Sequence, residues 1–270
     1  MPFHIPEHDV HDVLRPSPRT ESNMLDAETV CRQIYEETRS HYAELAPKLG
    51  SAALGFRILY GPPIVRAPYM FLGFQPGGWQ DESNEGQHEG WPDRSWYANA
   101  VSPLANRLRA VFGVEMVEHT GLNMVFFRAP NMKAWDCIPS KLKREMEQFS
   151  LERVDRIVET LRPQHLVVIG LRTFQQLTKT DGQTALLGQR GNRLVVDGNF
   201  GGIRASGIVH LSGARISRYD REQLKEHFKP SISNCDREGC VASVQGSGSI
   251  QARRSGAEYT FQHVAEGSAG

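Results

Sequence analysis

Short apolar runs alternate along the chain with longer segments whose apolar residues recur every three or four positions. An apolar run of strand length predicts a strand buried on both faces, whereas the wider spacing predicts an amphipathic helix. Strands are expected over residues 54–60, 69–74, 121–127, 166–169, 194–196 and 208–210. Strands of this kind, separated by helices, are typical of an α/β protein with a mostly parallel sheet covered on both faces.

Helical spacing marks the segments around these strands. Helices are expected over residues 27–49, 97–112, 139–162 and 221–228, with a further helix after Gly170. Pro103 falls inside the second segment, where it either occupies the first turn of the helix or divides it in two.

Composition changes at both ends of the chain. Residues 1–24 are rich in Pro, His and charge without periodicity, which predicts a loosely held arm. Residues 231–270 are rich in Gly and Ser and poor in large apolar groups, which predicts a disordered tail. One working domain is therefore expected over residues 25–230. Within it, the polar stretch 77–94 is long for a loop in a compact domain, and such loops are functional or disordered.

The charge balance restricts the kinds of partner. The chain carries 31 basic and 31 acidic side chains, so any contact with nucleic acid must come from a local basic patch. No apolar run approaches the roughly 20 residues of a membrane helix, and residues 1–6 lack the layout of a signal peptide. These features predict a cytoplasmic protein without a membrane partner.

The four cysteines are Cys31, Cys137, Cys235 and Cys240, and their spacing fits no metal-binding or redox motif. Reduced thiols are the main expectation, although Cys235 and Cys240 are close enough to form a clip under oxidation. No metal or cofactor is predicted.

Two segments carry residues suited to chemistry. The first is the apolar run Phe71-Leu72-Gly73-Phe74, which ends in the turn Gln75-Pro76-Gly77-Gly78. The second is Ile208-Val209-His210-Leu211-Ser212-Gly213-Ala214-Arg215, where an apolar run ends in a His and a small-residue turn. Strands that end in tight polar loops present ligand groups at the carboxyl edge of an open α/β sheet. An amide and an imidazole are therefore expected near one pocket.

These segments resemble motifs of the uracil-DNA glycosylase superfamily, and the resemblance covers roughly residues 66–228. Gly73-Phe74-Gln75-Pro76-Gly77 is similar to its first motif, spelled G-Q-D-P-Y, G-I-N-P-G or G-M-N-P-G. His210–Arg215 is similar to its second motif, H-P-S-P-L or N-P-S-G-L, and Asn123 matches an Asn of its middle strand. The resemblance implies a three-layer α/β/α sandwich around a central four-stranded, mostly parallel sheet.

The resemblance also implies a function. A monofunctional DNA glycosylase would hydrolyse the N-glycosidic bond of uracil or a related damaged pyrimidine in base-excision repair, as a monomer without metal or cofactor. Gln75 would hold the attacking water, and His210 would donate to the base oxygen as charge develops. The implied base-binding residues are Gly73, Phe74, Pro76, Gly77 and Asn123. The implied DNA-binding residues are Ser212, Gly213, Ala214, Arg215 and Arg218.

Three departures from the family pattern matter. Gln75 replaces Asp or Asn and cannot act as a general base. Leu211 replaces Pro, which loosens the second loop. Gly77 stands where uracil-strict members carry a Tyr, which predicts a larger pocket.

Rival interpretations stay open at this point. The chain could be a catalytically weak member that only binds nucleic acid or a nucleobase, or a nucleotide-processing α/β enzyme that does not act on DNA. Either motif could be an ordinary turn, and His210 could be a satisfied core histidine. The aromatic residues after the first motif fit either a core or a base-stacking role: Trp79, Trp91, Trp96 and Tyr97. The arginines near the second motif could form a basic patch: Arg204, Arg215, Arg218 and Arg221.

Overall fold

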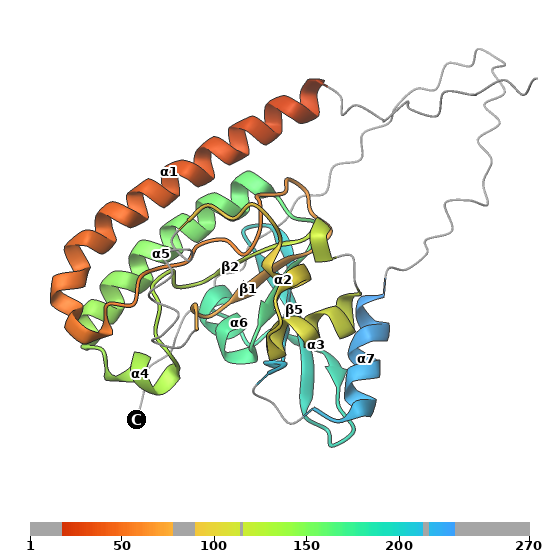
Figure 1. Ribbon diagram of the computed structural model, residues 1–270. Helices are drawn as coiled ribbons and strands as arrows, with labels where there is room; N and C mark the ends of the chain where they lie inside the picture. The colour runs from red at the N-terminus through yellow and green to blue at the C-terminus, as the bar shows by residue number, and fades with distance from the viewer. Residues whose placement is uncertain (1–17, 78–89, 114–115, 213–215, 230–270) are drawn as a thin grey trace, which may run out of the picture. The chain divides into compact units, whose positions relative to one another are not determined.

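The computed structural model describes residues 18–77, 90–113, 116–212 and 216–229 (Figure 1). By contacts, the chain divides into Met1–Lys229 and Pro230–Gly270, and the second unit lies outside the described residues. In the first unit, six strands form one sheet in the order β2-β1-β3-β6-β5-β4. The strands are β1 (Met70–Gly73), β2 (Thr120–Asn123), β3 (Leu166–Ile169), β4 (Gln183–Leu187), β5 (Arg193–Phe200) and β6 (Ile203–Ile208).

Four strands of the sheet pair in parallel, and two more are added by antiparallel pairing. β1 pairs in parallel with β2 and β3, and β3 pairs in parallel with β6. β5 and β4 then extend the sheet as an antiparallel hairpin on β6. Side chains along the parallel strands alternate between two apolar clusters: Met70 and Leu72 belong to one, and Phe71 belongs to the other. The strands are therefore buried on both faces, as parallel strands require.

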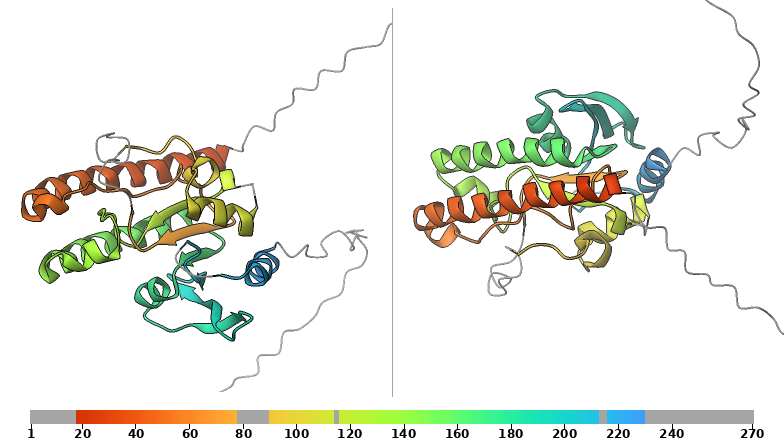
Figure 2. Two further views of the ribbon diagram at one scale, coloured as in Figure 1. Left: turned by 60° about the horizontal axis from the view of Figure 1, so that its bottom comes forward. Right: turned by 90° about the horizontal axis from the view of Figure 1, so that it is seen from above.

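Helices cover both faces of the sheet. One face is covered by α1 (Pro18–Leu49), α5 (Ser140–Leu161) and α6 (Leu171–Thr178), and Figures 1 and 2 show α1 beside α5. The other face carries α2 (Trp96–Asn99), α3 (Pro103–Phe112) and α7 (Arg218–Phe228). The short helix α4 (Met132–Cys137) and two 3-10 turns, Gly50–Ala52 and Met116–Glu118, complete the described elements.

The predicted class is confirmed: this is an α/β protein with a mixed, mostly parallel sheet flanked by helices. The predicted number of four strands is wrong, because the β4–β5 hairpin adds two strands to the four parallel ones. β4 was not expected because it is an edge strand with mostly exposed side chains, so it lacks a continuous apolar run.

Two strand predictions need correction. Residues 208–210 were expected to be a strand, but β6 ends at Ile208 and starts at Ile203, after a turn where Gly201 and Gly202 both have positive φ. Pairing with β5, which the sequence pattern does not show, decides these limits. Residues 54–60 form two isolated antiparallel bridges, Phe56 to Phe127 and Leu59 to Leu122, in place of a full strand.

The helix predictions are closer to the structure. Residues 97–112 do form two helices, with a break before Pro103 and Pro103 in the first turn of α3. α1 starts at Pro18, earlier than expected, so residues 18–24 are helical although they were assigned to the arm. Once a helix exists, each further residue adds a hydrogen bond, and Pro is tolerated in a first turn. The rest of the predicted arm and the predicted tail lie outside the described residues, as do residues 78–89 of the predicted loop.

None of the described helices combines the length and the apolar character needed to cross a membrane.

Candidate functional site

The strand order defines a topological switch point between β1 and β3. From β1 the chain continues to β2 on one side, and after β3 it continues to β4, β5 and β6, which all lie on the other side. Ligands of open α/β sheets bind outside the carboxyl ends of the strands at such a point. The loop with Gln75 follows β1, and Asn123 is the last residue of β2. The sequence-predicted groups therefore lie along the edge where the topology favours a ligand.

Backbone hydrogen bonds hold the loop after β1 against the segment after β2. Met124 N donates to Gly73 O and Val125 N donates to Phe74 O, both at 2.8 Å. Ala129 N donates to Pro76 O at 3.4 Å, and the buried Arg128 donates through Nη2 to Gly77 O at 3.4 Å. The parallel pairing thus continues in looser form beyond the sheet and positions the first motif.

In the side-chain amide of Gln75, the nitrogen has a hydrogen-bond partner, whereas the oxygen has none among the described residues. Its Nε2 donates to Ala129 O at 3.5 Å, which turns the amide toward the neighbouring loop. Its Oε1 is buried and has no hydrogen-bond partner among the described residues. A buried acceptor without a partner costs about 1–3 kcal/mol, so a bound donor such as water would be stabilised there.

Asn123 is held in one orientation. Its side chain is only 3 % exposed, and Nδ2 donates to Tyr60 Oη at 3.0 Å. On its other side, Oδ1 lies over Gly73, where an added Cβ would come within 2.7 Å of it. Gly73 is therefore required as glycine by the neighbouring amide, since any side chain would displace Asn123.

Tyr60, which fixes Asn123, was not predicted as a site residue. Its ring stacks on Tyr97 with centroids 5.4 Å apart and planes at 18°, and the Arg57 guanidinium lies 5.0 Å from the ring centroid. Trp96 packs edge-on against it, 5.3 Å away. Burial raises the pKa of the Tyr97 phenol well above its usual value, so this residue stays neutral. The only sequence signal for Tyr60 is its place at the end of an apolar run, just before Gly61.

His210 lies on the loop that follows β6. Val209 N donates to Leu194 O at 3.0 Å, which keeps this loop beside β5. His210 is exposed, and its Nδ1 lies 3.1 Å from Ser212 Oγ. Partial removal of the ring from water lowers the pKa of His210, and the nearby Arg107 guanidinium lowers it further. The imidazole is therefore neutral at pH 7.

The loop with His210 has two anchors. Leu211 is buried in the apolar cluster on the α3 and α7 face, and its carbonyl accepts a hydrogen bond from Arg107 Nη1 of α3. Whether the replacement of Pro by Leu loosens this loop stays a prediction; within the described residues, Leu211 itself is anchored by its side chain and its carbonyl. Arg107 was not predicted as a site residue, since nothing in the helix pattern links it to residue 211.

Strand spacing gives the separation of the predicted groups. Gly73 and Asn123 are register partners on neighbouring strands, so their backbones are about 4.8 Å apart. β6 lies two strands from β1 and three from β2, so the backbones are separated by about 10 and 14 Å. The shared cavity expected for Gln75, Asn123 and His210 stays a prediction.

The other predicted base-binding residues differ in position. Phe74 packs on Trp135 of α4, with centroids 5.7 Å apart, and Pro76 is buried. Both therefore support the loop. Gly77 is exposed, and a Cβ added there would meet no described atom within 4 Å. The larger pocket expected from the absent Tyr stays a prediction.

Of the predicted DNA-binding residues, Ser212 and Arg218 are exposed, whereas Gly213, Ala214 and Arg215 lie outside the described residues. Arg204 does not belong to the predicted basic patch, because it lies near the start of β6, far from the carboxyl edge, and pairs with Asp197 at 3.5 Å.

Three of the four candidate stacking aromatics are described, and they lie in two different places. Trp91 packs on Tyr35 of α1 at 5.4 Å, with the Arg32 guanidinium over its ring, so it belongs to the support structure. Trp96 and Tyr97 border Tyr60 instead, close to Asn123. Trp79 lies outside the described residues.

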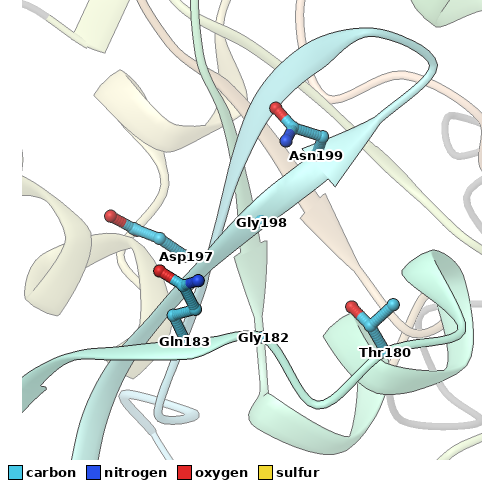
Figure 3. Close-up of a pocket in the computed structure, with 6 residues that line it drawn as sticks. All are labelled: Thr180, Gly182, Gln183, Asp197, Gly198 and Asn199. Carbon is cyan, nitrogen blue, oxygen red and sulfur yellow. The ribbon is translucent and has the colours of Figure 1, made fainter. Parts of the chain in front are cut away.

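An open depression of about 610 Å³ lies elsewhere, at the β4–β5 hairpin (Figure 3). Its lining residues are Thr180, Gly182, Gln183, Asp197, Gly198 and Asn199. None is a predicted site residue, and Asp197 already accepts from Ser206 Oγ and pairs with Arg204. This depression lacks a free reactive group and is the weaker candidate.

Comparison with known proteins adds no family: no family model matches the chain, and no curated protein is significantly similar to it.

Proposed function

We propose that this protein is a DNA glycosylase that hydrolyses the N-glycosidic bond of uracil or a related damaged pyrimidine. The fold that the resemblance implies, a uracil-DNA glycosylase-like sandwich, is part of this proposal. So are a monomeric cytoplasmic form, DNA as the partner, and the absence of a metal or cofactor.

The observation that carries the proposal is the fixed amide of Asn123 at the carboxyl edge. Exchanging the O and N of an amide exchanges its acceptor and donor, so a freely flipping Asn cannot tell uracil from cytosine. Tyr60 Oη accepts from Nδ2 at 3.0 Å and Gly73 makes room for Oδ1, so the structure presents the amide with its oxygen over Gly73. A fixed donor–acceptor pair at a switch point suits a ligand with a planar, edge-specific hydrogen-bond pattern.

His210 and Gln75 supply the groups that hydrolysis needs. When the N-glycosidic bond breaks, its electron pair leaves with the base, and the neutral imidazole of His210 can donate a hydrogen bond to the base oxygen while keeping its proton. Water then bonds to the sugar carbon, and the proton that it loses passes through solvent to the departed base anion, which becomes the neutral base. The buried Oε1 of Gln75 is an acceptor that can hold this water, although an amide cannot deprotonate it.

A second candidate is a catalytically weak protein that binds a nucleobase or nucleic acid. The hydrogen bond from Gln75 Nε2 to Ala129 O favours it, because this bond directs the amide toward its own loop.

The test is an excision assay with oligonucleotides that each contain one modified pyrimidine, followed by alkaline cleavage at abasic sites. Slow uracil excision that is nearly independent of pH around neutrality is expected, and Gln75→Asn or Gln75→Asp should keep or raise it. Binding of these DNAs without cleavage by any of the three proteins would support the second candidate. Brisk wild-type excision that Gln75→Asn abolishes would instead show that the longer side chain is matched to its substrate.

A further inference from the structure

The turn of the β4–β5 hairpin forms an exposed basic surface that the sequence motifs do not include. We call residues 188–193, Gly-Gln-Arg-Gly-Asn-Arg, the basic turn. Every residue from Gln189 to Arg193 is exposed. The segment 182–196 contains two arginines and no acidic residue, although the whole chain has zero net charge. Positive charge is therefore concentrated here.

The register of the sheet places the basic turn beside the candidate site. Val195 pairs with Ile208, and Val209 N donates to Leu194 O at 3.0 Å. Continuing this antiparallel register by one more step sets Arg193 opposite His210. Directly opposed residues in such a ladder have Cα atoms about 4.5–5.5 Å apart.

The basic turn is held in one conformation. Gly188 N donates to Asn192 O at 2.8 Å, and Gly191 N donates to Gly188 O at 2.9 Å, with Gly191 at a φ of 73°. The buried carboxylate of Asp220 accepts from Gln189 N at 2.8 Å, which ties the turn to α7. A rigid loop loses less entropy when it binds a ligand.

The hydrogen bond from Gln189 N to Asp220 also places the start of α7 next to the basic turn. Asp220 lies in the first turn of α7, whose first residue is the exposed Arg218. Ser217 caps this helix by accepting from Asp220 N at 3.0 Å. The acidic groups in this region are Asp220, which is engaged with the turn, and the exposed Glu222. The hydrogen bond from Gln189 N and the charge of Arg190 both lower the pKa of Asp220, and Arg218 lies two positions before it in the chain.

We propose that the basic turn binds phosphates of the DNA strand next to the base held at His210. This inference rests on the proposed function. Guanidinium groups bind phosphate oxygens in pairs, and Gln, Asn and glycine backbone add hydrogen-bond donors. Residues 188–193 carry no aromatic or aliphatic side chain, while the exposed Leu187 and Tyr219 flank the turn and Arg218. The paired guanidinium groups and amide donors of the turn itself match a nucleic-acid backbone.

The test compares two charge-matched double variants of the full chain. Arg190→Gln/Arg193→Gln removes two positive charges from the basic turn, and Lys225→Gln/Lys229→Gln removes two exposed ones near the opposite end of α7. Binding to a short fluorescein-labelled DNA duplex with one uracil is measured by anisotropy between about 50 and 200 mM salt. Uracil excision and melting temperature are measured on the same proteins.

Loss of two phosphate contacts should weaken binding roughly 30-fold near 0.15 M salt and lower the slope of log K against log salt by about 2. The lysine control should match the wild type, and all melting temperatures should agree. Equal affinity and slope in wild type and arginine variant would overturn the inference, while excision by both would leave the proposed function standing. A wild-type protein that neither binds nor cleaves the DNA would instead refute the proposed function. Tighter, turn-dependent binding to RNA of the same sequence would overturn the assignment to DNA.

Discussion

Two His–Ser pairs lie toward the amino and the carboxyl ends of the parallel strands, which we call the amino edge and the carboxyl edge of the sheet. They differ in what surrounds them. At the amino edge, His165 Nε2 lies 2.7 Å from Ser206 Oγ, and Ser206 donates onward to Asp197 Oδ1. Both members of this pair are buried. At the carboxyl edge, His210 Nδ1 lies 3.1 Å from Ser212 Oγ, and both residues are exposed.

The difference lies in burial and in the network that surrounds the buried pair. Ser206 has one hydroxyl proton and gives it to Asp197, so it accepts from His165 and the chain of bonds is closed. Arg204 pairs with the same carboxylate. His210 and Ser212, by contrast, are both exposed on the loop after β6. The same two residue types therefore hold the sheet together at one edge and remain accessible to a ligand at the other.

Two tyrosines, Tyr69 and Tyr60, show the same contrast between the two edges of the sheet. Tyr69 at the amino edge donates to Phe228 O at 2.9 Å and fastens α7 to the sheet. Tyr60 at the carboxyl edge accepts from Asn123 and orients a side chain that faces the predicted site. Paired variants at the two edges can therefore separate stability from function.

The largest expected effect is the pH dependence of stability at the amino edge. Burial, with help from Arg204 and His227 and against Asp197, lowers the pKa of His165 from 6.5 to about 4. The unfolded chain then binds more protons than the folded one between these values, so stability is full above pH 6.5 and falls toward pH 4. The loss should reach about 3 kcal/mol. Urea unfolding measured across this range checks it.

His165→Gln is the control for this pH effect, because Gln can still donate to Ser206 but does not titrate. Burial also lowers the pKa values of His210 and His227, so a smaller slope of the same sign should remain in this variant. If the free energy of unfolding changed equally with pH in both proteins, protonation of His165 would not be the cause of the pH dependence.

The next effect concerns catalysis at the carboxyl edge. His210→Ala should lower single-turnover excision of uracil by about 10²-fold or more, because one transition-state donor is lost. The melting temperature should stay within a few degrees, since His210 is exposed. Single-turnover rates and thermal melts of both proteins measure this. An unchanged rate would assign the carboxyl-edge pair, like the amino-edge pair, to structure.

The smallest effect separates the two tyrosines. Tyr60→Phe keeps the ring stacked on Tyr97 but releases Asn123 Nδ2, so selectivity for uracil over cytosine should fall roughly tenfold. Tyr69→Phe also removes one hydroxyl but should cost only about 1 kcal/mol of stability. Competition assays with the two substrates and thermal melts give both quantities. If Tyr69→Phe altered selectivity as much, the proposed role of Tyr60 would be lost.

Most of the architecture could be predicted from the sequence. Residues 166–169 are apolar throughout and bounded by Pro163 and Gly170, and residues 139–162 show helical spacing over several turns. Patterns of this strength reflect burial on two faces or on one face, so they identify the α/β class without knowledge of any partner. The elements that failed are those with weak local patterns. β4 is an exposed edge strand, and the lower limit of β6 is set by its pairing with β5.

For the site, the sequence by itself identified Gln75, Asn123 and His210 as chemically capable residues at the ends of apolar runs. Only the tertiary structure decided which partners act on them. Tyr60 meets Asn123 across 63 positions and Arg107 meets Leu211 across 104, and no local periodicity records such contacts. Likewise, the two His–Ser pairs became distinguishable only when the register of β5 and β6 placed Asp197 beside Ser206. Burial patterns are local properties of a sequence, whereas a hydrogen bond between distant residues depends on how the strands pair and how the helices pack.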